Sequence, residues 1–227
     1  MLRRHDRVYL RIDRLTPEAM KHCGVSAHAV ALVRAWCEAG HPFAARRCDD
    51  WHKAGGLPHK TAISCIPLAF RLPGTKPGIA FAAPSDALRG RLRALPLAEA
   101  VPAAFPTLRP DLNAFAREAE EAGLSFLVYG SLFWQAVTCM DYMTAGSDID
   151  LLYEPETRAS LHRALLFLES RDAIGGHRLD GEVVFPCGAG VSWRELRSGA
   201  GRLLVKRMGG VALVPAHELL AQLEAVA

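Results

Sequence analysis

Two aspartates, Asp148 and Asp150, stand one residue apart in the apolar run SDIDLL near the middle of the chain. Alternate side chains of a β-strand point to the same face, so we expect both carboxylates on one side of a strand, about 6–7 Å apart. Two such charges raise each other's pKa unless a cation lies between them. Mg²⁺, with Mn²⁺ as an alternative, binds carboxylate oxygens and usually brings phosphates with it. The pair therefore predicts a metal site for phosphate chemistry.

Gly130 and Ser131 lie upstream, where the apolar stretch SFLVYG ends and the stretch SLFWQAVTCM begins. This pattern predicts a strand over 125–130 that is followed directly by a helix. Glycine lets an anion approach the backbone, and a helix N-terminus presents free N–H groups to it. The two residues therefore predict a phosphate cradle, and a role of Ser131 as helix N-cap alone is the alternative.

The second half of the chain supplies the elements that must position these residues. Its apolar periodicity predicts further helices over 111–123, 156–171 and 216–227. Short apolar runs predict strands over 147–154, 181–186, 201–207 and 210–215. Strands interleaved with helices are typical of an α+β fold in which helices flank a small mixed sheet.

The first half has a different composition. Residues 1–110 carry 17 Lys and Arg against 8 Asp and Glu, whereas residues 111–227 carry 10 against 16. A helix is predicted over 26–40 among short strands, and the run RGRLRAL at 89–95 is typical of a solvated helix face. Four prolines in 96–110 indicate a linker. We therefore expect a basic mixed α/β domain over 1–95, a linker over 96–110 and a second domain over 111–227.

Several function classes are disfavoured by composition. The six cysteines form no CxxC pair, which favours reduced thiols and a cytoplasmic location. No apolar stretch reaches the roughly 20 residues that cross a bilayer, so no membrane contact is expected. No known nucleic-acid motif is present, so no nucleic-acid partner is expected.

The order strand, Gly-Ser, helix and Asp-Ile-Asp resembles the nucleotidyltransferase core of the DNA polymerase beta superfamily. Sixteen residues separate Ser131 from Asp148, somewhat more than is usual in that superfamily. The resemblance implies a third carboxylate on a later strand, and Asp180 and Glu182 are the candidates. We favour Glu182, because it begins the apolar VVF run rather than lying in the turn before it.

A closer resemblance covers nearly the whole chain. The segments RRHDRVYL, HPFAARR, YGSLFWQAVT, SDIDLL, GEVVFP, VSWREL and LLVKR are similar in content and order to the phosphoribosyl-dephospho-CoA transferases that mature malonate decarboxylase. The resemblance implies a triphosphoribosyl-dephospho-CoA donor, a serine acceptor on the acyl-carrier subunit, and release of pyrophosphate. It also implies that Asp148, Asp150 and Glu182 hold the metal and that Gly130 and Ser131 cradle the departing phosphates.

Three alternatives remain open at this level. Another nucleotidyltransferase, one that moves AMP from ATP to a protein or small molecule, would carry the same core motif. A catalytically silent binding module of the same fold is a further possibility. Arg46, Arg47 and Lys206 are candidate contacts to the donor or the partner, because arginine's planar fork suits phosphate oxygens, or they are ordinary solvated charges.

Overall fold

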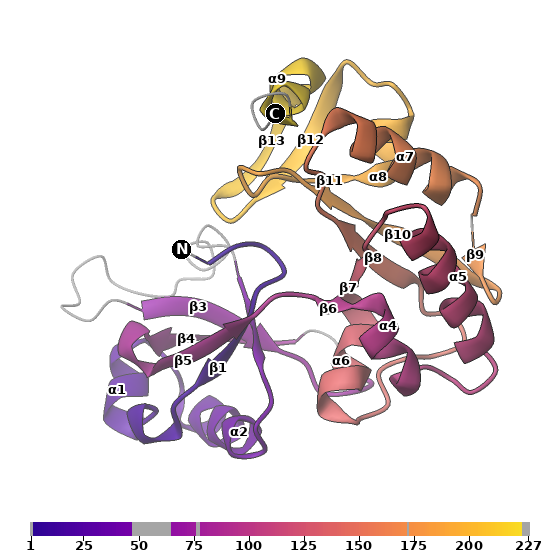
Figure 1. Ribbon diagram of the computed structural model, residues 1–227. Coiled ribbons are helices and arrows are strands. Elements are labelled where there is room, and N and C mark those ends of the chain that lie inside the picture. The colour runs from indigo at the N-terminus through magenta and orange to yellow at the C-terminus, as the bar shows by residue number, and fades with distance from the viewer. Residues whose placement is uncertain (1, 47–64, 76–77, 172, 224–227) are drawn as a thin grey trace. The chain divides into compact units, whose positions relative to one another are not determined.

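The computed structural model describes residues 2–46, 65–75, 78–171 and 173–223 (Figure 1). Its internal contacts divide the chain into two compact units. The first contains residues 1–93 with 208–210, and the second contains residues 94–207 with 211–227.

The first unit is built on an antiparallel sheet in the order β4-β3-β2-β1-β5. Its strands are β1 (Arg7–Leu10), β2 (Phe43–Ala45), β3 (Cys65–Phe70), β4 (Ile79–Pro84) and β5 (Leu88–Leu92). Two short 3₁₀ helices, η1 (Ile12–Arg14) and η2 (Ser85–Ala87), accompany the helices α1 (Pro17–His22) and α2 (Ala27–Glu38). Thr16 and Ser26 cap these two helices, since their hydroxyls accept from the N–H groups of Ala19 and Ala29.

Aromatic rings fill the core of the first unit. Phe43 lies 5.1 Å from Phe81 and 5.7 Å from Phe70, centroid to centroid. Trp36 of α2 lies 4.8 Å from Phe70, and its indole N–H donates to the Pro42 carbonyl. This helix therefore packs on the sheet through an aromatic side chain whose polar atom is satisfied.

The second unit contains the mixed sheet β13-β12-β11-β10-β8-β7-β6, with β9 paired to β10. Its strands are β6 (Leu95–Pro96), β7 (Leu127–Val128), β8 (Ile149–Tyr153), β9 (Ala173–Ile174), β10 (His177–Val184), β11 (Gly190–Ser192), β12 (Arg202–Arg207) and β13 (Gly210–Pro215). The central strands β8 and β10 run parallel, whereas β7 is antiparallel to β8 and β11 is antiparallel to β10.

Helices flank this sheet. They are α4 (Leu97–Ala100), η3 (Val101–Ala103), α5 (Arg109–Glu121), α6 (Gly130–Thr138), α7 (Arg158–Glu169), α8 (Trp193–Arg197), α9 (Ala216–Leu220) and η4 (Ala221–Leu223). Phe115 of α5 packs 5.1 Å from Phe167 of α7 and 5.6 Å from Phe126. These rings bind the two longest helices of the unit to the chain that enters β7.

The predicted α+β class is confirmed, with an antiparallel sheet in the first unit and a mixed sheet in the second. The expected helix over 26–40 corresponds to α2, and the strand, helix and strand around the Gly-Ser and Asp-Ile-Asp motifs correspond to β7, α6 and β8. None of the helices in the described part of the chain is both long and apolar enough to cross a membrane.

The proline-rich stretch 96–110 differs from the expected linker, because it is folded. It contributes α4 and η3, and Leu97, Val101 and Leu108 are buried. Three of its four prolines lie where a missing N–H does no harm: Pro96 is the residue before α4, and Pro102 and Pro110 lie in the first turns of η3 and α5.

Two further expectations are corrected in the first unit. The run 89–95 lies largely in strand β5 rather than in a helix, and β5 pairs with β1. Cys23 and Cys65 form a disulfide, with their Cα atoms 6.2 Å apart, where reduced thiols were expected. Cys37, Cys139 and Cys187 are free.

Candidate active site

The two central parallel strands bring carboxylates together. Asp150 of β8 lies directly beside Asp180 of β10 in the strand register. Side chains that face each other in register share one face of the sheet. Ile149 and Leu151, which point to the other face, are almost fully buried. β8 begins at Ile149, so Asp150 lies within the strand and Asp148 is the residue that precedes it.

The Gly-Ser motif lies against the same carboxylate. Gly130 begins helix α6 with a left-handed φ of 67°, and a Cβ built there would lie 2.7 Å from the Cγ atom of Asp150. The neighbouring Tyr129 N–H donates to the Asp150 carbonyl at 3.0 Å. Only glycine combines this backbone angle with so close a carboxylate. The N-terminus of α6, with Ser131 in its first turn, thus adjoins Asp150.

Arg178 supplies positive charge to this cluster. Its Nη2 and Nε donate to the two carboxylate oxygens of Asp148 at 2.6 and 3.2 Å. The same Nη2 lies 3.5 Å from an oxygen of Asp180. His177, the preceding residue, donates through Nδ1 to the Ser147 carbonyl at 2.7 Å, which fixes the chain as it enters β8.

The aspartates differ in their electrostatics. The hydrogen bond from Arg178 lowers the pKa of Asp148. Burial, reinforced by the negative charges of Asp180 and Asp148, raises the pKa of Asp150 to about 7. A carboxylate held this close to two others favours a cation beside it. The arrangement therefore suits a divalent ion, although among the described residues no three His, Cys, Asp or Glu side chains already converge as ligands.

Glu182 lies on the same face of β10 but has a different surrounding. Its side chain is 4% exposed and accepts from Lys206 Nζ at 2.8 Å. In the register Glu182 lies opposite Leu152 rather than opposite Asp150. The register therefore makes Asp180 the direct neighbour of Asp150, whereas Glu182 lies two residues further along β10 and is paired with Lys206.

Arg46 and Arg47 are the remaining residues that were predicted to contact the donor or the partner. Arg46 follows β2 in the first unit, and its N–H donates to the Pro67 carbonyl at 3.0 Å. Arg47 lies outside the described residues.

Sequence reasoning did not single out Arg178. The signal available was the alternation of Arg178, Asp180 and Glu182, which places all three on one face of a strand.

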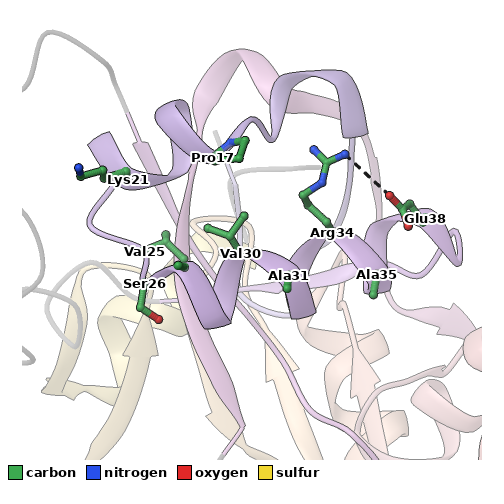
Figure 2. Close-up of a pocket in the computed structure, with 10 residues that line it drawn as sticks. Pro17, Lys21, Val25, Ser26, Val30, Ala31, Arg34, Ala35 and Glu38 are labelled. Carbon is green, nitrogen blue, oxygen red and sulfur yellow. Dashed lines mark ion pairs between the residues drawn. The ribbon is translucent and has the colours of Figure 1, made fainter.

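A cavity of about 780 Å³ lies in the first unit and contains none of these residues. It is lined by α1, α2 and the turn between them (Figure 2). Figure 2 shows small apolar side chains such as Val25, Val30 and Ala31 along it, with the Arg34–Glu38 ion pair at one end.

The family model and the curated relatives that match this chain carry the same description. Residues 92–217 match the family model described as the phosphoribosyl-dephospho-CoA transferase MdcG C-terminal domain. A phosphoribosyl-dephospho-CoA transferase from Xanthomonas campestris is 32% identical over 95% of both chains, and one from Xanthomonas euvesicatoria is 30% identical over the same share. A protein of that name from Bradyrhizobium diazoefficiens is 40% identical over 41% of each chain.

No solved structure gave a significant match. The family model lies almost entirely within the second unit, which carries the carboxylates and Gly130. Together with relatives that match along nearly the full length, this match shows that the chain belongs to the phosphoribosyl-dephospho-CoA transferase MdcG family of enzymes.

Proposed function

We propose that the protein transfers the phosphoribosyl-dephospho-CoA group from 2'-(5''-triphosphoribosyl)-3'-dephospho-CoA to a serine of the acyl-carrier subunit of malonate decarboxylase, with release of pyrophosphate. The observation that carries the proposal is the contact of the Asp150 carboxylate with Gly130 at the start of α6, beside Asp180. This contact joins an anion-binding helix terminus to a cluster of acids on one sheet face.

The residues present fit a divalent cation. Asp148, Asp150 and Asp180 are hard oxygen donors, with Asp150 and Asp180 side by side on adjacent strands and Asp148 directly before β8. Burial is the main cause of the raised pKa of Asp150, and the charges of Asp180 and Asp148, which a cation would offset, raise it further. These three residues would hold Mg²⁺ or Mn²⁺. When bound, the ion would neutralise the donor's phosphates and stabilise the attacking and leaving oxygens.

The third carboxylate is assigned here to Asp180, in preference to Glu182. Asp180 adjoins Asp150 in the register and its side chain is 37% exposed, so it can reach a ligand on the open face. Glu182 is almost fully buried and its charge is already offset by Lys206. The position of Glu182 supports a role in holding β10 and β12 together.

The chemistry is an in-line displacement at phosphorus. The serine oxygen of the carrier bonds to the phosphorus next to the ribose, and the bond from that phosphorus to the pyrophosphate oxygen breaks. A carboxylate of the cluster accepts the serine proton. The free N–H groups at the start of α6, at Gly130 and Ser131, bind the departing phosphates.

Charges outside the cluster have supporting roles in this proposal. Arg46 and Arg47 of the first unit contact the donor or the acidic carrier, since the first half of the chain is rich in Lys and Arg. A CoA-derived donor supports a cytoplasmic location for the reaction.

One experiment separates this function from AMP transfer. The protein is incubated with the apo carrier subunit and Mg²⁺, with either the triphosphoribosyl donor or ATP, and the carrier is weighed by intact-mass spectrometry. A mass increase equal to the phosphoribosyl-dephospho-CoA group, with the donor alone, supports the proposal. An AMP-sized increase with ATP would replace it by the adenylyl-transfer alternative, and an unmodified carrier in both reactions would favour a silent binding module.

A further inference from the structure

Arg178 contacts two of the candidate metal ligands, Asp148 and Asp180. It lies two residues before Asp180 on β10, and therefore on the same face. Its guanidinium engages both oxygens of Asp148 and approaches Asp180. One side chain thus contacts two of the three carboxylates that the proposed function assigns to the metal.

The contact uses the lone pairs that a metal would need. A guanidinium that bonds to both oxygens of a carboxylate occupies the in-plane positions between them. A divalent ion that binds both oxygens of Asp148 must therefore displace the Arg178 guanidinium from them. Arg178 offsets one of the three negative charges, and Arg194 acts on Asp148 more weakly, so positive charge still has to be supplied by a ligand.

Arg178 is placed so that it can move. Its side chain is 58% exposed and Asp148 is 33% exposed, and exposed ion pairs of this kind contribute little to folding stability. The Lys206–Glu182 pair contrasts with it, because Glu182 is only 4% exposed. Arg178 can therefore leave Asp148 without disturbing the core, whereas Lys206 stabilises a buried charge.

We propose that Arg178 is a resident counterion that exchanges with the metal. In the metal-free protein it holds Asp148 and Asp180 together. When the cation and the donor bind, the guanidinium leaves the carboxylates and binds oxygens of the donor's triphosphate, whose geometry matches its planar fork. This inference rests on the proposed function and adds to it a substrate-contacting residue.

The test is binding rather than turnover. Mn²⁺ binding is measured by the electron paramagnetic resonance of free Mn²⁺, first without any phosphate. Arg178→Gln removes the competitor, so we expect it to bind Mn²⁺ about fivefold more tightly than the natural protein. Binding of inorganic triphosphate is then measured by calorimetry in saturating Mn²⁺, where we expect Arg178→Gln to bind about tenfold more weakly.

Opposite shifts in the two measurements are the signature of exchange. Arg178→Lys keeps the charge but loses the fork, so its Mn²⁺ affinity should stay near that of the natural protein while its triphosphate affinity falls. Arg117→Gln removes an arginine that is paired with Glu121 on α5 and should change neither affinity. Circular dichroism and thermal melting of all variants report whether each is folded.

The outcomes are distinct. If Arg178→Gln binds Mn²⁺ as the natural protein does, or more weakly, or if its triphosphate affinity is unchanged, the exchange is wrong. If the natural protein and Asp150→Asn show the same weak Mn²⁺ binding, the metal site itself is wrong, and the proposed function fails with it. Mn²⁺ binding that is lost in Asp150→Asn but unaltered in Arg178→Gln overturns the exchange alone.

Discussion

The carboxylate of Asp150 fills the space that a side chain at residue 130 would need. A Cβ on Gly130 would lie 2.7 Å from the Asp150 Cγ atom, and Gly130 also has a left-handed φ of 67°. The close packing of the start of helix α6 against strand β8 therefore depends on a glycine at residue 130.

Gly130→Ala should reduce transfer activity by about 100-fold, because the added methyl displaces the Asp150 carboxylate, and small displacements of reacting groups have effects of this order. The rate of carrier modification measures it. Gly123→Ala is the matched control: Gly123 has a similar φ of 69°, but apart from its chain neighbours no atom of the described residues lies within 4 Å of its built Cβ. Alanine is strained by the positive φ at both positions, so equal activity in the two variants would show that the contact with Asp150 does not affect catalysis.

Asp180→Asn and Glu182→Gln identify the third carboxylate. We expect Asp180→Asn to lose Mn²⁺ binding and activity while its melting temperature stays near that of the natural protein. Glu182→Gln should retain Mn²⁺ binding but lose about 2 kcal/mol in its free energy of unfolding, because the charged hydrogen bond with Lys206 is weakened. The reverse pattern, in which only Glu182→Gln loses metal binding, would restore the assignment favoured from the sequence.

The raised pKa of Asp150 predicts a pH dependence of stability in the metal-free protein. The carboxyl has a pKa of about 7 in the folded state against 3.8 as its ordinary value, so the folded state binds more protons than the unfolded state between these values. The free energy of unfolding contributed by this group therefore falls as the pH rises from about 4 to about 7.

Urea unfolding at pH 5 and pH 8 in EDTA, for the natural protein and for Asp150→Asn, measures this contribution. The difference between the two proteins isolates Asp150 from the histidines, which titrate in the same range. We expect Asp150→Asn to gain stability relative to the natural protein as the pH rises. A difference that is constant with pH would contradict the raised pKa.

The disulfide between Cys23 and Cys65 predicts how many of the cysteines react with a thiol reagent. Of the six cysteines, at most four should react with a thiol reagent in denaturant without reductant, including Cys37, Cys139 and Cys187. Non-reducing peptide mapping should recover a cross-linked pair of peptides that contain Cys23 and Cys65. Six reactive thiols in freshly purified protein would contradict the pairing and agree with the expectation from the sequence.

Local patterns were sufficient to predict the elements around the site. Gly130 between an apolar run and a helical pattern marked the end of β7 and the start of α6, and alternation around Ile149 marked β8. These signals depend on neighbouring residues alone, so a single sequence carries them.

The pairing of β8 with β10 could not be predicted in the same way. The strands are parallel and are joined through α7 and β9, so no tight turn fixes their register. A shift of two residues along β10 exchanges Asp180 for Glu182 beside Asp150 without moving either to the other face. The sequence therefore identified both candidates, and only the register distinguishes their surroundings.

Two errors arose from composition being given more weight than periodicity. The prolines of 96–110 were interpreted as marks of a linker, although proline is also favoured in the first turn of a helix, as at Pro102 and Pro110. The arginines Arg89 and Arg91 alternate with Leu88, Gly90 and Leu92, which is the period of a strand.

The most direct test of the account is the intact mass of the acyl-carrier subunit after incubation with the triphosphoribosyl donor, with Mg²⁺ or EDTA, and with the natural protein or Asp150→Asn. The account predicts a mass increase equal to the phosphoribosyl-dephospho-CoA group, with one pyrophosphate released per carrier, only for the natural protein with Mg²⁺. Full modification by folded Asp150→Asn, or equal modification in EDTA, would contradict it.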